Sequence, residues 1–401
     1  MIYIDVTEKD HFKDDCYKCE KNEVPTQSAN GSTVPLVDSR KNDPEMGEYD
    51  PFQHRKLEHP TSDMDTLIHL LKGSLGSGVL AMPLAFSHAG LFFGLICTFL
   101  IGIICTYCVH ILVKSAHELS RRSRVPSLGF AEVAEAAFLS GPPSVQQWAK
   151  FAKAMINMFL VIDLLGCCCV YIVFVAKKYS TVATGMGITF YYIFSDLPSI
   201  DSQPAFAGFS NLPAFFGTAI FALEGVLNTG MSFVVLLYAT TGFFGYLKYG
   251  EDTKLGSITL NLPKDEPLAQ SVKIMIAVAV FFTYALQFYV PMEIIWKAVK
   301  NNFGSKKTWA EYGIRISLVV LTVILAILIP NLGGFISLVG AVCLSMLGLI
   351  FPAIIDLVTF YDEPRSGKIN WRLWKNVFLI CFGLIGFATG TYVSIIDIIH
   401  G

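Results

Sequence analysis

HLLKGSLGSG, residues 69–78, places three glycines and two serines in its last six positions, inside an apolar segment long enough to cross a membrane. These residues destabilise a regular helix, because glycine loses the most backbone entropy and serine competes for backbone hydrogen bonds. Within a bilayer, free peptide groups are tolerated only where protein or a water-filled cavity surrounds them. We therefore expect a broken membrane helix here, and in transporters such breaks surround the substrate.

The composition excludes an ordinary soluble domain. The 401 residues are 53% hydrophobic and 15% charged, with a mean hydropathy of +0.53. Soluble chains of this length carry more charge and fewer apolar residues. The formal net charge of −2 argues against a nucleic-acid partner.

Two regions follow from the pattern of polar and apolar residues. Residues 1–62 are rich in Asp, Glu, Ser, Pro and Asn, which predicts a disordered acidic tail. Residues 63–401 form the predicted transmembrane domain, an all-α polytopic membrane protein embedded in the lipid bilayer. Its apolar spans are long enough to cross a bilayer and lie at 66–89, 91–114, 151–176, 269–296, 310–330, 334–358 and 374–399. A short amphipathic helix is expected at 130–139.

The basic loops predict the orientation. Clusters of Lys and Arg at 114–124, 297–307 and 365–375 all face the cytosol when the N-terminus is cytosolic and the C-terminus lies outside. The tail would then be available to cytosolic partners. Either the plasma membrane or an endolysosomal membrane fits this pattern.

Residues 213–246 fit neither a single helix nor a hairpin. One helix of this length would run about 51 Å, well beyond a hydrocarbon core of about 30 Å. A hairpin that turns near Gly225 leaves a first leg of only about 20 Å. This arithmetic indicates that part of a membrane domain is missing here.

Several blocks along the chain resemble the proton-coupled amino acid transporters of the amino acid/auxin permease family. They are LIHLLKGSLGSGVLAMPLAFSHAG (67–90), GCCCVYIVFVAK (166–177), PAFFGTAIFALEG (213–225), GSITLNLP (256–263), FFTYALQFYVPMEII (281–295), ILAILIPNLGGFISLVGAV (324–342) and GTYVSIIDI (390–398). The resemblance implies an inverted-repeat amino acid permease fold, with the first and sixth helices broken around the substrate.

Measured against that family, the chain is incomplete in two places. The fourth helix and the front of the fifth are missing between Lys178 and Thr181, and the second half of the sixth is missing after Gly225. Both gaps coincide with the irregular region. The chain is therefore interpreted as a shortened form of the fold.

The broken stretch supplies the first candidate site. Its backbone amides and hydroxyls can bind a carboxylate, because anions are stabilised at helix N-termini. Close packing of small residues against another helix is the alternative. The substrate-binding residues predicted here are Gly73, Ser74, Gly76, Ser77 and Gly78.

Two residues are candidates for proton coupling. His69 lies one turn before the break, and an ordinary histidine pKa of about 6.5 suits proton exchange near neutral pH; the alternative is a histidine that only packs. Glu224 lies within an apolar stretch, where an acid is a functional candidate by default, although the missing segment could leave it solvated at a turn. Glu224 is also assigned to the substrate site, with Phe221 beside it. Asp163 is a weaker proton candidate.

The match to the eighth helix of the family adds Tyr284 and Gln287, which share a helix face at a spacing of three residues. Both are predicted to line the substrate pathway, near a kink at Pro291. Asp356 and Asp397 lie near the ends of spans and are expected to be solvated.

The resemblance implies proton-coupled symport of small neutral amino acids. The alternative is a transport-deficient isoform that acts as a nutrient-linked scaffold or as a regulatory partner of a longer form. No motif for a metal, a cofactor, a phosphate-binding loop or a nucleophile with its base is present, so we predict no enzyme activity.

Overall fold

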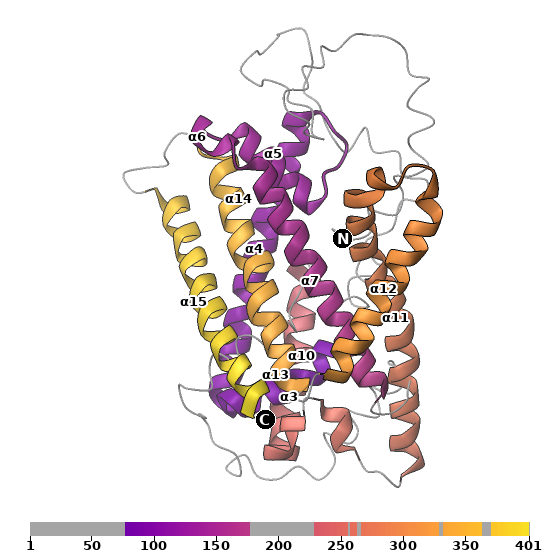
Figure 1. Cartoon of the computed structure of the whole chain (residues 1–401). Helices are drawn as coiled ribbons and strands as arrows, with labels where there is room; N and C mark the ends of the chain where they lie inside the picture. The colour runs from indigo at the N-terminus through magenta and orange to yellow at the C-terminus, as the bar shows by residue number, and fades with distance from the viewer. Residues whose placement is uncertain are drawn as a thin grey trace. The chain divides into compact units, whose positions relative to one another are not determined.

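The computed structural model describes residues 77–176, 228–255, 257–262, 266–328, 332–362 and 370–400, and within these ranges every regular element is a helix (Figure 1). The predicted tail at 1–62, residues 63–76 and residues 177–227 lie outside the described part. The elements are α3 (Ser77–Ala89), α4 (Leu91–Ser123), α5 (Phe130–Ser140), α6 (Pro143–Gln146), α7 (Ala149–Ala176), α10 (Asn228–Tyr249), η5 (Gly250–Leu255), η6 (Ile258–Asn261), α11 (Pro267–Val299), η7 (Lys300–Lys306), α12 (Lys307–Leu328), α13 (Leu332–Val339), η8 (Gly340–Ile350), α14 (Phe351–Thr359) and α15 (Trp371–His400).

Membrane-length helices confirm the predicted class. Six described helical segments are long and apolar enough to cross a bilayer. Every predicted span from 91–114 onward corresponds to helical segments of the structure. The short helix expected at 130–139 is α5. The main difference is in α4, which continues nine residues beyond the predicted end at 114, to Ser123. A helix continues readily past the apolar span, because Glu118 pairs with Arg121 and Arg122 along its surface.

The irregular region resolves partly into one helix. α10 is described over Asn228–Tyr249, 22 residues or about 33 Å, which is enough to span the hydrocarbon core. Residues 213–227 are outside the described ranges, so the first part of the apolar run remains a prediction.

The described chain divides into two compact units, which we treat separately. The first comprises residues 108–158 and 351–380, and the second comprises residues 77–107, 159–350 and 381–400, with the gaps given above. Helices α4, α7 and α15 each contribute residues to both units.

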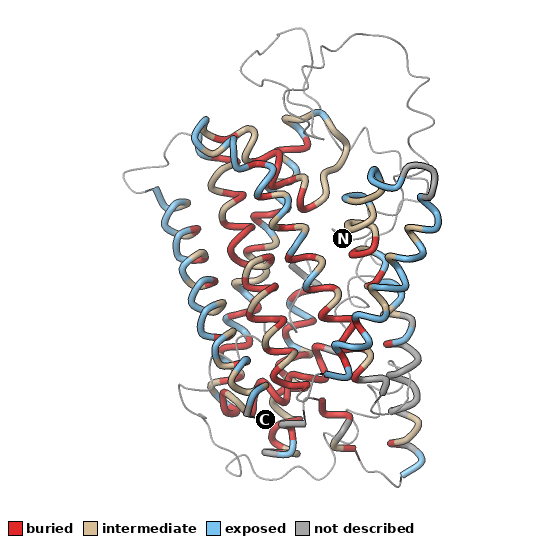
Figure 2. The backbone as a smooth tube through the Cα atoms, in the orientation of Figure 1, coloured by how far each residue is buried: buried red, intermediate tan, exposed pale blue. Residues whose placement is uncertain are grey.

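In the second unit, α3 is enclosed by α10, η5 and η6. Its residues are almost all buried, including Met82 and Phe86, as Figure 2 shows by colour. Glycines make this close approach possible. A Cβ atom at Gly242 of α10 would lie 2.4 Å from two ring carbons of Phe86, and one at Gly245 would lie 2.5 Å from Pro83. These distances are below any ordinary contact, so only glycine fits.

A second seam joins α15 to α13 and η8. The hydroxyl of Ser394 donates to that of Ser337 over 2.8 Å, and both residues are buried. A Cβ atom at Gly383 would lie 2.7 Å from the Ile350 side chain. Small residues of this kind allow membrane helices to approach closely. η8 is a π-helix that ends shortly before Pro352, whose nitrogen has no proton to donate to the preceding turn.

In the first unit, α5 contacts α14 and forms an ion pair with α7. The Nζ atom of Lys153 lies 2.6 Å from Glu135 Oε2, and only 3% of the Glu135 side chain is exposed. Gly141 packs against Val358 so closely that a Cβ atom would lie 2.6 Å from it. The short helix predicted at 130–139 is therefore largely buried.

Other helix faces are apolar and exposed. Along α12, only Thr322 and Ala326 are buried, whereas Ile316, Ile327 and Leu328 are open to the surroundings. α15 shows a similar row (Figure 2). An apolar exposed face of membrane length indicates contact with lipid.

Candidate functional site

Of the broken stretch predicted to bind the substrate, the structure describes only the part that belongs to α3. Gly78 is buried in the first turn of α3, which is described from Ser77 onward. The other predicted residues of the broken stretch (Gly73, Ser74, Gly76) and the proton-coupling candidate His69 lie outside the described residues, as do Phe221 and Glu224.

Packing fixes the position of α3 firmly. The ring of Phe86 fills the space beside Gly94 of α4 and Gly242 of α10, and Pro83 fills the space beside Gly245. Close-packed side chains transmit strain and leave few voids. The N-terminal turn of α3, with Gly78, is therefore held on a rigid element, as a binding residue requires.

Tyr284, on α11, is held by a hydrogen bond to α12. Its hydroxyl lies 3.0 Å from Thr322 Oγ1, and Thr322 donates its own proton to the Val319 carbonyl over 2.8 Å. Tyr284 is therefore the donor in the first bond, because a hydroxyl carries a single proton. The Tyr284 ring also stacks on Phe288, with centroids 5.9 Å apart.

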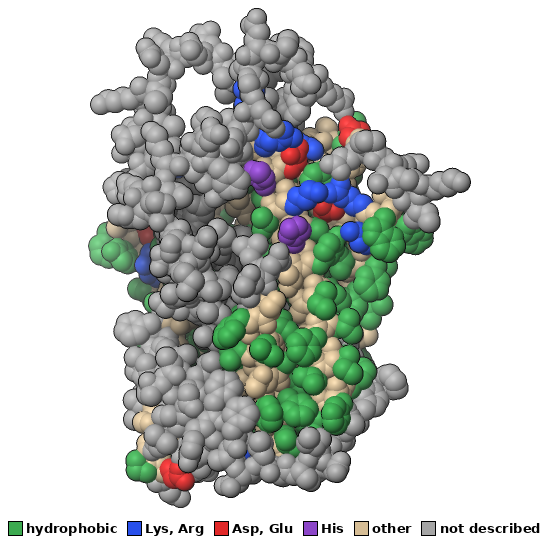
Figure 3. All heavy atoms as spheres, turned by 180° about the vertical axis from the view of Figure 1, so that it is seen from behind, with side chains coloured by type: hydrophobic (Ala, Val, Ile, Leu, Met, Phe, Trp, Pro, Cys, Tyr) green, Lys and Arg blue, Asp and Glu red, His purple; other side chains and the backbone are tan. Residues whose placement is uncertain are grey.

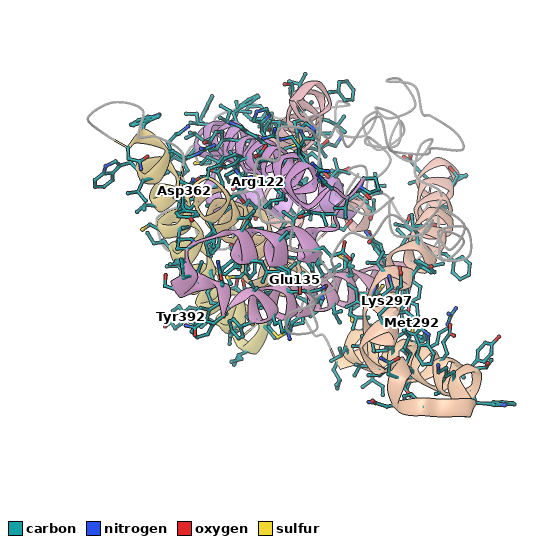
Figure 4. The ribbon with its side chains drawn as sticks, turned by 90° about the horizontal axis from the view of Figure 1, so that it is seen from above. Arg122, Glu135, Met292, Lys297, Asp362 and Tyr392 are labelled. Carbon is teal, nitrogen blue, oxygen red and sulfur yellow. The ribbon has the colours of Figure 1, made fainter. Side chains whose placement is uncertain are left out.

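The same contacts link three helices of the second unit. Phe288 and Met292 of α11 form a buried cluster with Cys168 of α7, and the thiol of Cys169 approaches the Thr322 carbonyl at 3.5 Å. Met292 and Lys297 are labelled on α11 in Figure 4. The sequence analysis did not single out Thr322. Its position as a polar residue in the apolar segment 310–330 is the feature of the sequence that could have identified it.

Gln287 lies one turn beyond Tyr284 on α11, and its side chain is partly buried. Within the part of the chain that the structure describes, its amide makes no hydrogen bond. An amide offers two donors and one acceptor, so it can bind either end of a zwitterion. The structure therefore places Tyr284 and Gln287 on one helix and Gly78 on another, within the same compact unit.

The burial of the acidic residues can be compared with the prediction from the sequence. Asp356 was expected to be solvated, and this is wrong. Only 2% of it is exposed, and its Oδ2 atom accepts bonds from Asn376 at 2.7 Å and Arg372 at 3.2 Å. Asp397 is partly buried. Asp163 is 1% exposed in the interior of α7, which agrees with its prediction as an acid within a span.

A metal centre has no candidate in the described ranges, because no three His, Cys, Asp or Glu side chains gather there. The three cysteines of α7, at 167–169, are buried and are free thiols. Within the described residues, Gln287 thus offers an amide side chain without a hydrogen-bond partner, and Tyr284 offers a ring that is fixed in place.

Comparison with known proteins gives the family. A sequence model described as "Transmembrane amino acid transporter protein" matches residues 59–195 and 205–396. The chain is 38% identical to "Proton-coupled amino acid transporter-like protein pathetic" of Drosophila melanogaster, over 92% of the chain and 93% of that protein. It is 22% identical to "Amino acid transporter AVT3A" of Arabidopsis thaliana, over 84% of the chain and 90% of that protein.

The length of one alignment concerns the segments that the sequence predicts to be missing from this chain. The alignment with the Drosophila protein spans 440 positions, more than the 401 residues of this chain. Part of that protein therefore has no counterpart here.

Proposed function

The chain belongs to the family of transmembrane amino acid transporters, and we propose that it carries small neutral amino acids across a membrane in symport with protons. Membership makes it an integral membrane protein that transports amino acids and is not an enzyme. The relative named as proton-coupled supports coupling to protons.

The observation that carries the proposal is the buried, fixed position of α3 directly after the glycine-rich stretch. Its first described turn contains Gly78, and its remaining residues are packed against α10. A helix N-terminus in a low-dielectric setting stabilises a carboxylate through its free amides. In the proposed function, Gly73, Ser74, Gly76, Ser77 and Gly78 bind the carboxylate of the amino acid.

α11 is proposed to form another wall of the site. Gln287 supplies a free amide for the polar atoms of the substrate, and Tyr284 gives a rigid aromatic surface because Thr322 and Phe288 hold it. Phe221 and Glu224 are proposed to complete the site from the sixth helix of the fold.

Protons are proposed to move through His69 and Glu224. The buried Asp163 is a further proton candidate, because an acid within a span is expensive to keep without a function.

The test is amino acid uptake into proteoliposomes that contain the purified chain. An inward proton gradient should accelerate uptake of glycine, alanine or proline, and His69→Ala should abolish that acceleration. His110→Ala is the matched control, because His110 is an exposed residue of α4. Absence of gradient-driven uptake by a well-folded preparation would overturn the proposed function.

The proposed shortening is compatible with transport only if the remaining helices close the site. We propose that the residues missing relative to the Drosophila protein fall between Lys178 and Thr181 and after Gly225. Sequencing the transcript across residues 176–230 tests this placement.

The comparisons favour transport over the alternative of a scaffold, because relatives named as transporters match along most of the chain. Loss of a cytosolic partner on deletion of residues 1–62, with uptake unchanged, would assign the tail a role separate from transport.

A further inference from the structure

Three cationic side chains surround one aromatic ring in the first unit. The Phe360 ring lies just beyond the end of α14. The guanidinium carbon of Arg372 is 4.1 Å from its centroid, the Lys114 ammonium is 5.3 Å away and the guanidinium carbon of Arg122 is 5.8 Å away. All three fall within the range of cation–π attraction, about 6 Å. We call Phe360 and these three cations the Phe360 cluster.

Neighbouring acids balance only part of this charge. Glu118 pairs with Arg122 at 2.7 Å, and it also binds Arg121. Asp356 pairs with Arg372 at 3.2 Å. Within the described ranges, Lys114 has no carboxylate partner and is exposed. Lys114 is thus the cation of the Phe360 cluster for which the described residues offer no carboxylate, and like charges this close repel each other unless an anion joins them.

Arg122 is held in place by a hydrogen bond in addition to its ion pair. Its Nη1 donates to the Thr359 carbonyl over 2.8 Å, which ties α4 to the end of α14, and Figure 4 shows Arg122 beside the end that carries Asp362. The Thr359 hydroxyl is buried and has no hydrogen-bond partner among the described residues. This buried hydroxyl is out of reach of an outside group, so a phosphate meets the cluster at the exposed Lys114.

Exposed aromatic residues place the cluster at the boundary between lipid and water. Trp371 and Trp374 share one face of α15 with Phe378, and the three side chains are 67%, 62% and 59% exposed. Tryptophan is enriched at membrane interfaces, where its apolar ring and polar N–H meet both phases.

The exposed surface of α4 changes in the same way along its length. Apart from His110, its exposed side chains are apolar as far as Val113, and Lys and Arg begin at Lys114. Figure 3 shows Lys and Arg side chains gathered at one end of an apolar face. Lipid chains can cover the apolar part, while the headgroup layer meets the cations.

We propose that the Phe360 cluster binds the phosphate of an anionic phospholipid, with the acyl chains lying against Trp374 and Phe378. Basic pockets between membrane helices bind such headgroups. Asp362 is exposed near the same end and repels anions. The phosphate therefore binds on the side of the ring where Lys114 lies, and zwitterionic headgroups gain no advantage there.

The test follows the melting temperature of the purified full-length protein in mild detergent. Dioctanoyl phosphatidylglycerol, dioctanoyl phosphatidylcholine and inorganic phosphate are added at equal concentrations. The first raises the melting temperature, and the other two leave it unchanged. An equal rise with inorganic phosphate identifies a site for soluble anions and overturns the proposal, as does an equal rise with phosphatidylcholine.

Two variants localise the effect. Lys114→Gln weakens the apparent affinity for phosphatidylglycerol about fivefold, the effect of one basic side chain at an anionic surface. Lys150→Gln removes the same charge from an exposed position of α7 in the same unit, at a residue that is not part of the Phe360 cluster, and leaves the affinity unchanged. Equal losses in both variants, or no loss in Lys114→Gln, contradict a site at the Phe360 cluster.

Discussion

The contact of α3 with α10 and the contact of α5 with its neighbours are both buried, but different interactions hold them. The first is apolar, and glycines such as Gly242 allow Phe86 to approach the backbone. The second contains the ion pair of Glu135 with Lys153, in which the carboxylate is nearly inaccessible to solvent. One depends on shape and the other on paired charge. They should therefore respond to opposite kinds of substitution.

The charged contact should give the largest effect. Glu135→Gln leaves the Lys153 ammonium without its buried partner, and breaking such a pair costs about 3 kcal/mol, the lower end of the usual range, because 23% of the Lys153 side chain is exposed. The melting temperature in detergent, followed by size-exclusion chromatography after heating, should fall strongly.

A double variant sharpens this prediction. Glu135→Leu with Lys153→Met removes both charges, and apolar replacements of buried pairs are often neutral. It should therefore be more stable than Glu135→Gln. If the double variant is the less stable of the two, the ion pair is not what holds α5.

The apolar contact should break on the addition of one carbon atom. Gly242→Ala places a Cβ atom 2.4 Å from the Phe86 ring, and overpacking of this kind costs about 2 kcal/mol. Gly313→Ala makes the same change in α12, where nothing lies within 4 Å. That control should gain up to about 1 kcal/mol in helix propensity. Melting curves of the two variants measure the difference.

A rescue variant tests the cause. Phe86→Leu, added to Gly242→Ala, removes the clashing ring atoms and should recover part of the lost stability. A double variant that melts lower than Gly242→Ala would show that Phe86 is not the obstacle.

The sequence predicted the spans well because a bilayer imposes a simple rule of length and hydrophobicity. Segments such as 151–176 and 334–358 correspond to α7 and to the run from α13 to α14. The break predicted at the glycine-rich stretch stays a prediction, because most of that stretch lies outside the described residues. Partners could not be read in the same way. Nothing local to Gly242 indicates that Phe86 lies against it.

Burial of charge was the weaker part of the prediction. Asp356 lies near the end of a span, where solvent is the usual expectation, yet Asn376 and Arg372 of α15 enclose it. That enclosure depends on contacts between helices, which charge counting along the chain does not contain. Of the candidate site, the positions of Tyr284 and Gln287 on one helix face could be predicted, but the bond of Tyr284 to Thr322 could not.

Tyr284→Phe should have an intermediate effect, because it removes a hydroxyl and retains the ring. The lost bond to Thr322 is worth about 1 kcal/mol, and the stacking on Phe288 persists. Tyr289→Phe, at an exposed position of the same helix, is the control and should melt like the parent. The KM for uptake separates the two roles of Tyr284. A rise in KM indicates that the hydroxyl also contacts the substrate, whereas an unchanged KM leaves it with the structural role alone.

The smallest effect should come from an exposed ion pair. Glu311 and Arg315 lie 3.0 Å apart on α12, and both side chains are largely open, with exposures of 37% and 47%. Glu311→Gln should therefore change stability by no more than about 0.5 kcal/mol, with any difference disappearing at high salt. The chemical change is the same as in Glu135→Gln, so the two melting temperatures isolate the contribution of burial. If both variants have the same melting temperature, burial does not strengthen the pair of Glu135 with Lys153. The distinction between the charged contact and the apolar contact then fails.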